Sequence, residues 1–190
     1  VITSKDLYYE GFDTQAAEFY SGAAEGSDTA WAAEARKLGI KVTEYTRASW
    51  NALSPEWRNK LGLEYESVAR DLARPVIPLG GRGDVEVRRD MMHADKADAI
   101  FAIGTPVKPG QRGAKYINKA NHEVVDGGTG YAVQRGIQRG IPVYLYDRVA
   151  KQWKMWDGNS QSFVATEEPT LTPHAAVVGT RGDIIPGTNK

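Results

Sequence analysis

Short apolar runs alternate with helix-forming stretches along most of the chain. Five runs have the length and composition of strands, at residues 18–21, 40–45, 97–104, 141–146 and 175–178. The run at 97–104 is largely apolar, which is typical of a strand buried on both faces of a parallel sheet. Helices are predicted over 29–38 and 131–139, because Gly39 and Gly140 supply helix stops. This alternation predicts a parallel α/β sandwich with right-handed crossovers.

Three stretches fall outside the alternation. Residues 55–74 form one amphipathic pattern, which predicts a long helix with Trp50 and Trp57 packed beside it. Strand-like residues flank Asp157-Gly158-Asn159, which predicts a hairpin over 153–164. Residues 1–17 are interpreted as a short helix in a loop. We therefore expect one domain over 1–190, with a helical insertion at 51–83 and a hairpin and linker at 148–173.

Composition and charge narrow the possible functions. Lys plus Arg and Asp plus Glu number 24 each, so the formal net charge is zero, which argues against a nucleic-acid or membrane-surface partner. The chain has no cysteine and only three scattered histidines, so we expect no metal site and no required cofactor. No apolar run is long enough to span a membrane. We expect a cytoplasmic protein, of a bacterial cell or a phage-infected host.

Three glycine-rich turns follow predicted strands, at 22–28 after the first run, at 127–130 after a short strand at 124–125, and at 179–182 after the last run. Ligands of open parallel sheets bind at the carboxyl ends of the strands, so these turns are expected on one rim. Glycines let the backbone approach a phosphate, and a following helix offers free N–H groups. One such turn alone can reflect strand-to-helix geometry, and Ser27 or Asp28 alone can be a helix N-cap. Neither of the two common glycine-rich phosphate motifs is present. Together the turns predict a phosphate-bearing ligand.

These segments resemble the SLOG superfamily, a Rossmann-like group that includes YpsA, the DNA-processing protein DprA and the LOG phosphoribohydrolases. Residues 22–30 resemble the family's GGAxGADxxA turn, with Ala23 and Ser27 at altered positions. Arg88-Arg89 and the run at 97–100 resemble the arginine-bearing helix and the following ADA(I/F/L) strand. Residues 127–130 resemble the second glycine turn, and residues 178–181 resemble the VG(S/T)R turn.

The last of these motifs stands at the opposite end of the chain from its place in most relatives. There it ends the first strand and precedes the GGAxGAD turn, whereas here it closes the sequence. A chain cut after the first strand and joined at its old termini would have this order. The resemblance therefore implies a Rossmann-like three-layer sandwich with a mainly parallel sheet, circularly permuted as in a YpsA-like subgroup, with an inserted helix and a β-hairpin.

The resemblance also bears on catalysis. LOG enzymes cleave nucleoside monophosphates with the motif PGGxGTxxE, and here Gln134 stands at the glutamate position and Tyr131 at the threonine position. Glutamine cannot act as an acid or a base, and losing such a group typically costs about 10²–10⁴-fold in rate. Asp126 and Asp28 are the catalytic candidates if the protein is an enzyme, and Asp147 ends a strand on the same rim. The role expected first for each of the three is that of a cap or a backbone-fixing group.

The leading hypothesis is a binder of a nucleotide-derived small molecule, such as an ADP-ribose-like, NAD-like or cyclic nucleotide signal, without catalysis. It would act as a sensor or as a sponge that sequesters an immune signal. The alternatives are a nucleotide N-glycosidase, phosphoribohydrolase or phosphohydrolase, and a molybdenum-cofactor carrier. Five tryptophans in a modest core also suggest a homo-oligomer. The expected ligand-binding residues are Gly22, Ala23, Gly26, Ser27, Asp28, Arg89, Gly127, Gly128, Thr129, Gly130, Tyr131, Gln134, Gly179, Thr180 and Arg181.

Overall fold

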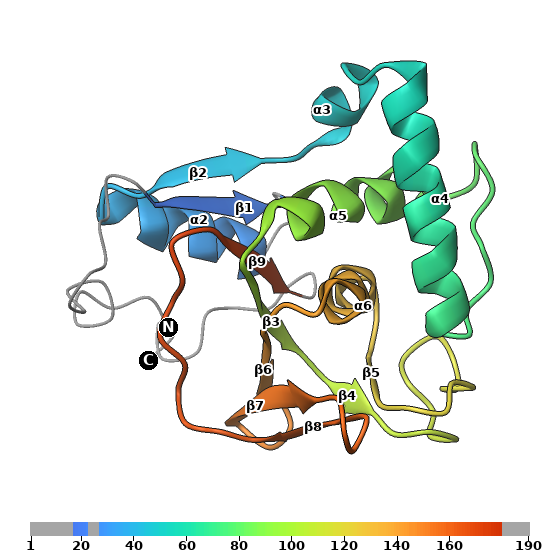
Figure 1. Ribbon diagram of the computed structural model, residues 1–190, viewed down its shortest axis with the longest axis vertical. Helices are drawn as coiled ribbons and strands as arrows, with labels where there is room; N and C mark the ends of the chain where they lie inside the picture. Colours follow the sequence, from blue (N-terminus) through green and yellow to red (C-terminus); the bar gives the residue numbers. More distant parts are fainter. Residues whose placement is uncertain (1–16, 23–26, 180–190) are drawn as a thin grey trace.

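A seven-stranded sheet forms the centre of the protein in the computed structural model, which describes residues 17–22 and 27–179 (Figure 1). The strand order across the sheet is β2-β1-β9-β3-β6-β7-β8. The strands are β1 (Glu18–Ser21), β2 (Lys41–Glu44), β3 (Ala99–Gly104), β6 (Val143–Asp147), β7 (Gln152–Asp157), β8 (Ser162–Ala165) and β9 (Ala175–Gly179). The first five strands in this order are parallel, and β7 and β8 add antiparallel pairs at one edge. The expected mainly parallel α/β sheet and the expected hairpin are thus confirmed.

Helices cover both faces of this sheet and give it three layers. They are α2 (Ser27–Lys37), α3 (Arg47–Asn51), α4 (Pro55–Asp71), α5 (Asp84–Lys96) and α6 (Thr129–Arg139). Helix α2 packs on one face, whereas α5 and α6 pack on the other. Helix α4 crosses the outer side of α5 and α6 (Figure 1). The architecture is therefore a Rossmann-like sandwich with one helix added outside it.

The apolar pattern of the central strands divides the core between the two faces. All six residues of β3 are buried, as the predicted apolar run requires. Phe101 and Ile103 pack with the α2 layer, and Ile100 and Ala102 pack with the layer of α5 and α6. A third cluster joins α4 to α5 and α6 and includes the fully buried Tyr65. The insertion thus has an apolar contact of its own with the sandwich.

One predicted strand lies outside the main sheet. β5 (Val124–Val125) pairs antiparallel with β4 (Pro106–Val107), and these two form a separate small sheet. The expectation that the turn at 127–130 follows a strand of the main sheet is therefore wrong. The turn still lies near that sheet, because the N–H of Asp126 donates to the carbonyl of Thr105, one residue beyond β3, at 2.9 Å.

The long predicted helix is present, but it ends earlier than expected and exposes one of its tryptophans. α4 starts at Pro55 after the N-cap Ser54, whose hydroxyl accepts from the N–H of Trp57 at 3.3 Å. Trp50 is buried as expected, but Trp57 is 53% exposed, so its predicted packing is wrong. None of the helices in the described residues is long and apolar enough to cross a membrane.

Candidate functional site

The three central parallel strands end side by side. β1 ends at Ser21, β9 at Gly179 and β3 at Gly104, and in the β3–β9 pair Ile103 is the register partner of Gly179. When β9 is counted first, the parallel strands have the order 3-2-1-4-5, which is that of a doubly wound sheet. Its switch point lies between β9 and β3. The carboxyl ends of β1, β9 and β3, here called the rim, are where such folds bind ligands.

The glycine turn at 127–130 lies beside the rim at the start of α6. Gly127 has a φ of +72°, a conformation that favours glycine. A Cβ at Gly130 would collide with the carbonyl of Val125, so this position needs glycine for a close approach of backbone to backbone. Thr129 starts α6, and its buried hydroxyl oxygen has no hydrogen-bond partner in the part of the chain that the structure describes. This helix start therefore carries a buried polar atom whose partner is not among the described residues.

Asp126 fixes the loops around the turn. Its Oδ2 accepts from the N–H of Ala114 at 2.9 Å, and its Oδ1 accepts from the N–H of Gly127 at 3.0 Å. A Cβ at Gly113 would meet the same Oδ1. Both carboxylate oxygens thus hold backbone amides, which is a structural use of this residue. The geometry gives no support to Asp126 as a catalytic base.

Arg74 holds the turn from the other side, and the sequence analysis missed it. Its guanidinium donates to the carbonyls of Val125 and Gly127, each at 2.8 Å, and lies 5.1 Å from the ring centroid of Tyr131. The ring of Tyr131 also packs on Tyr65 at 5.7 Å and is 4% exposed. Burial raises the pKa of this phenol. Stacking of a base on Tyr131 would require its ring to leave these contacts.

Arg89 lies on α5, one turn before a residue whose ring contact leads to the end of β1. This helix runs back toward the start of β3, so its earlier residues lie nearer the strand ends. His93, one turn after Arg89, stacks on Tyr45 at 6.4 Å, and the N–H of Tyr45 donates to the last residue of β1, Ser21. The Arg89 guanidinium lies 3.6 Å from the carboxylate of Asp90, and its buried Nε has no partner among the described residues. It is a mostly buried cation with unused donor capacity.

Gln134 lies away from these groups. Its side chain is 5% exposed and lines a cavity of about 420 Å³ together with Asp71, His122 and Gln138. Gln134 and the end of the glycine turn thus belong to the same helix. The cavity that Gln134 lines, however, includes no residue of the rim. The predicted grouping of Gln134 with the glycine turn receives no support from these contacts.

Asp147, the last residue of β6, has a capping role. Its Oδ1 accepts from the N–H groups of Val149 and Ala150, and its Oδ2 lies 2.9 Å from the ammonium of Lys154. Burial works to raise the pKa of Asp147, but the hydrogen bonds from Lys154 and the two amides outweigh it and hold the pKa below its usual value. The carboxylate is therefore committed to the turn after β6.

A second cavity, of about 480 Å³, opens beside the end of β3. Its lining includes Thr105, Gln111, Arg112 and Asp126. The loop that forms it carries Lys108, Arg112, Lys115 and Lys119, with no acidic residue between 105 and 122. Sequence reasoning missed this basic loop, although four cations in twelve residues are a visible signal. The loop makes the surroundings of the rim attractive to anions.

Other predicted site residues have no described side chain. Ala23, Gly26, Thr180 and Arg181 lie outside the described residues, and Ser27 and Asp28 are described only as the start of α2. Gly22 is buried at the end of β1. Within the described residues, no group of three or more His, Asp or Glu side chains is arranged to hold a metal ion.

Comparisons with protein-family models, curated proteins and solved structures found no match to this chain.

Proposed function

We propose that the protein binds a nucleotide-derived small molecule, of the ADP-ribose, NAD or cyclic-nucleotide class, at the rim and does not turn it over. One observation carries this proposal: a glycine turn and helix start lie against the end of β3, at the switch point of a doubly wound sheet. Glycines and a helix N-terminus suit a phosphate there. The buried hydroxyl of Thr129, which has no partner in the described part of the chain, supplies a further donor at the same place.

Positive charge around the rim supports a phosphate-bearing ligand. The buried Nε of Arg89 has no partner within residues 17–22 and 27–179, and guanidinium groups bind phosphates through paired hydrogen bonds. The basic loop at 108–119 lies beside the end of β3 and can attract a second phosphate. A ligand with two phosphates and a ribose would use both sources of charge.

Two observations favour binding over catalysis. The position that carries the catalytic glutamate in LOG enzymes is Gln134, which lines another cavity. Asp126 holds two backbone amides through its carboxylate oxygens. The chain would then act as a sensor or as a sponge for a signalling nucleotide.

The test starts with the small molecules that the purified protein releases on denaturation, identified by mass spectrometry. Isothermal titration with ADP-ribose, NAD, AMP and a cyclic dinucleotide follows. We expect at least one ligand with a Kd below about 100 μM, equivalent to about 5.5 kcal/mol. Arg89→Met should weaken that ligand by at least about tenfold, because a charge-assisted hydrogen bond is worth about 1.5–3 kcal/mol.

Arg36→Met is the matched control, since Arg36 is an exposed arginine of α2 paired with Glu44. Its binding should equal that of the unmodified protein. Equal binding by Arg89→Met, or no ligand below about 100 μM, would refute the proposed site. Free base and ribose 5-phosphate accumulating from AMP would instead show an N-glycosidase.

A further inference from the structure

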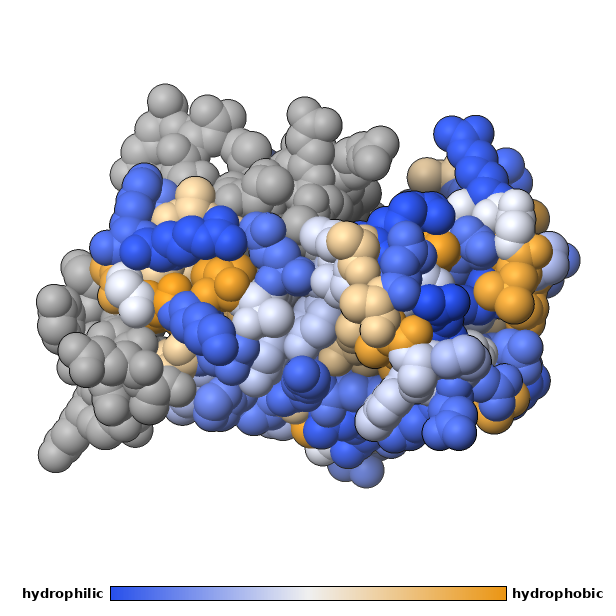
Figure 2. All heavy atoms as spheres, turned by 90° about the horizontal axis from the view of Figure 1, so that it is seen from above, coloured by the Kyte–Doolittle hydropathy of each residue, from blue (hydrophilic) through white to orange (hydrophobic). Residues whose placement is uncertain are grey.

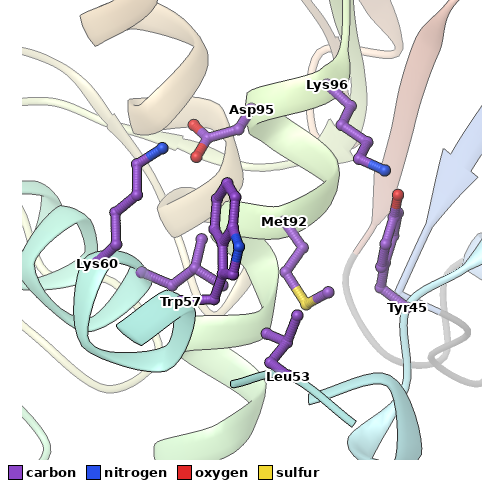
Figure 3. A pocket seen from close by; sticks show the side chains of 8 residues that line it. Tyr45, Leu53, Trp57, Lys60, Met92, Asp95 and Lys96 are labelled. Carbon is purple, nitrogen blue, oxygen red and sulfur yellow. The ribbon is translucent and has the colours of Figure 1, made fainter. Parts of the chain in front are cut away.

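A separate cavity of about 410 Å³ lies between α4, α5 and the connecting residues on either side of α3 (Figure 3). It falls within the usual size range of small-molecule sites, about 300–1,000 Å³. None of its lining residues belongs to the rim. They are Tyr45, Leu53, Trp57, Lys60, Leu61, Met92, Asp95 and Lys96.

The walls of this cavity are apolar and aromatic. Leu53, Leu61 and Met92 supply the aliphatic and thioether surface, and Trp57 stands among them (Figure 3). More than half of the Trp57 side chain is exposed, so a large aromatic surface is available to a ligand. Figure 2, which views this end of the molecule from above, shows apolar patches over α3 and α4 among hydrophilic side chains. Such a surface favours a flat, apolar ligand body.

Two ammonium groups give the cavity a positive charge. Lys60 Nζ lies 4.6 Å from the ring centroid of Trp57, and Lys96 Nζ lies 5.5 Å from that of Tyr45. Neither lysine forms an ion pair with any residue that the structure describes. The carboxylate of Asp95 is already paired with Arg135, at 2.6 Å. Among the described residues, Lys60 acts on Glu64 and Lys96 acts on Glu18 only from beyond ion-pair distance, so both ammonium groups can still pair with an anion in the cavity.

The wall also contains a polar atom without a partner. The hydroxyl of Tyr45 is buried and makes no hydrogen bond within the described residues. Figure 3 shows it on the same side as the Lys96 ammonium, whereas Lys60 and Asp95 lie on the other side of Trp57 and Met92. A buried hydroxyl usually finds a partner, because leaving it unpaired costs about 1–3 kcal/mol. Its presence beside Lys96 marks that end of the cavity as a place for an acceptor.

From these features we propose that the cavity binds a small aromatic anion. The flat ring would lie against Trp57 and Met92, and its carboxylate, sulfonate or phosphate would pair with Lys60 or Lys96. The site is independent of the nucleotide proposed for the rim, although α5 supplies Arg89 to one and Met92 to the other.

The test uses 8-anilinonaphthalene-1-sulfonate as the probe and N-phenyl-1-naphthylamine as its uncharged counterpart, each followed by fluorescence. We expect one sulfonate per chain with a Kd of about 10–100 μM, and at least about fivefold weaker binding of the amine. Lys60→Met and Lys96→Met should each weaken sulfonate binding by about three- to tenfold, and added salt should weaken it further. Lys37→Met on α2 is the control, and it should bind the sulfonate as the unmodified protein does.

Leu53→Trp provides a second variant that leaves the charge unchanged, since the larger side chain fills the cavity and should abolish binding. Circular dichroism checks that each variant is folded. Equal affinity for both probes, unchanged binding in the lysine variants, or several sulfonates per chain would overturn the proposal. So would a dimer in sedimentation whose formation excludes the sulfonate, because a second copy would then occupy the cavity. Displacement of the sulfonate by saturating ADP-ribose would assign the probe to the rim and also refute a separate site.

Discussion

Replacement of Glu64 by glutamine should raise the free energy of unfolding at pH 8, where the charged Glu64 carboxylate destabilises the fold. Glu64 lies on α4 with its side chain 14% exposed, and its Oε1 is 3.5 Å from the guanidinium of Arg135. Its Oε2 is buried and has no partner among the described residues. Burial, and then the hydrogen bond and negative charge of Asp95, raise the pKa of Glu64 to about 7, although Arg135 and Lys60 oppose them.

The direction of the effect follows from proton binding. Between the ordinary pKa of 4.5 and about 7, folded Glu64 keeps a proton that the unfolded chain has released, so the free energy of unfolding falls as pH rises. The full shift corresponds to about 3 kcal/mol at about 1.36 kcal/mol per pKa unit. Solvent screening reduces the expected loss to about 1–2 kcal/mol.

Urea denaturation followed by tryptophan fluorescence, from pH 4.5 to pH 8.5, measures this effect. Glu64→Gln should match the unmodified protein near pH 4.5 and exceed its free energy of unfolding by about 1–2 kcal/mol at pH 8. Glu66→Gln, which removes a carboxylate from the same helix, is the control and should keep the original pH dependence. A difference in free energy of unfolding that stays constant across this pH range would refute the prediction. So would a Glu64→Gln variant that is less stable than the unmodified protein at pH 8, because the buried carboxylate would then not destabilise the fold.

Two further substitutions test the turns around the rim. Asp147→Asn should lower the free energy of unfolding by about 1–2 kcal/mol at pH 7, through loss of the pair with Lys154. Because the pKa of Asp147 is lowered, this difference should shrink as pH falls below 3.8, and a difference that persists in acid would contradict the pairing. Gly130→Ala should cost about 2 kcal/mol or more in thermal unfolding, since its Cβ meets the carbonyl of Val125, whereas Gly128→Ala has open space and should change little. Equal melting temperatures for the two alanine variants would contradict the predicted collision.

The centre of the main sheet could be predicted from local pattern because its strands are short and rich in apolar residues. β3 is buried along its full length, β9 is buried at all but its last residue, and β6 is buried at alternate residues. The helix ends could be predicted as well, because glycine favours the left-handed backbone that ends many helices. Gly140, at the end of α6, has a φ of +71°. β5 was wrongly assigned to the main sheet, because two valines before a glycine turn fit a strand of the main sheet and a strand of a small separate sheet equally well. Only the pairing with β4 distinguishes the two cases.

The buried arginines could not be predicted in the same way. Arg74 finds its carbonyl partners 51 and 53 residues further along the chain, and no local pattern indicates such a distance. Arg88 lies on a helix rich in charge, yet it is buried over the ring of Tyr65 and donates to the carbonyl of Ile77 at 2.8 Å. A guanidinium with carbonyl and aromatic partners can be buried, so its charge says little about exposure. Trp57 shows the converse, because an aromatic residue at a helix start was expected inside and lies half outside.

The strand order explains why the glycine turns indicate a ligand site only when they are considered together. β9 comes last among the described strands, yet it pairs with both β1 and β3, and it joins β1 and β2 to the rest of the sheet. The rim is therefore built from strands far apart in the sequence, which end at Ser21, Gly104 and Gly179, and the turn at Gly127 lies beside it. Each of these glycines alone is compatible with ordinary turn geometry. Their juxtaposition depends on the position of β9. The strand order therefore indicates a ligand site that no continuous sequence motif indicates.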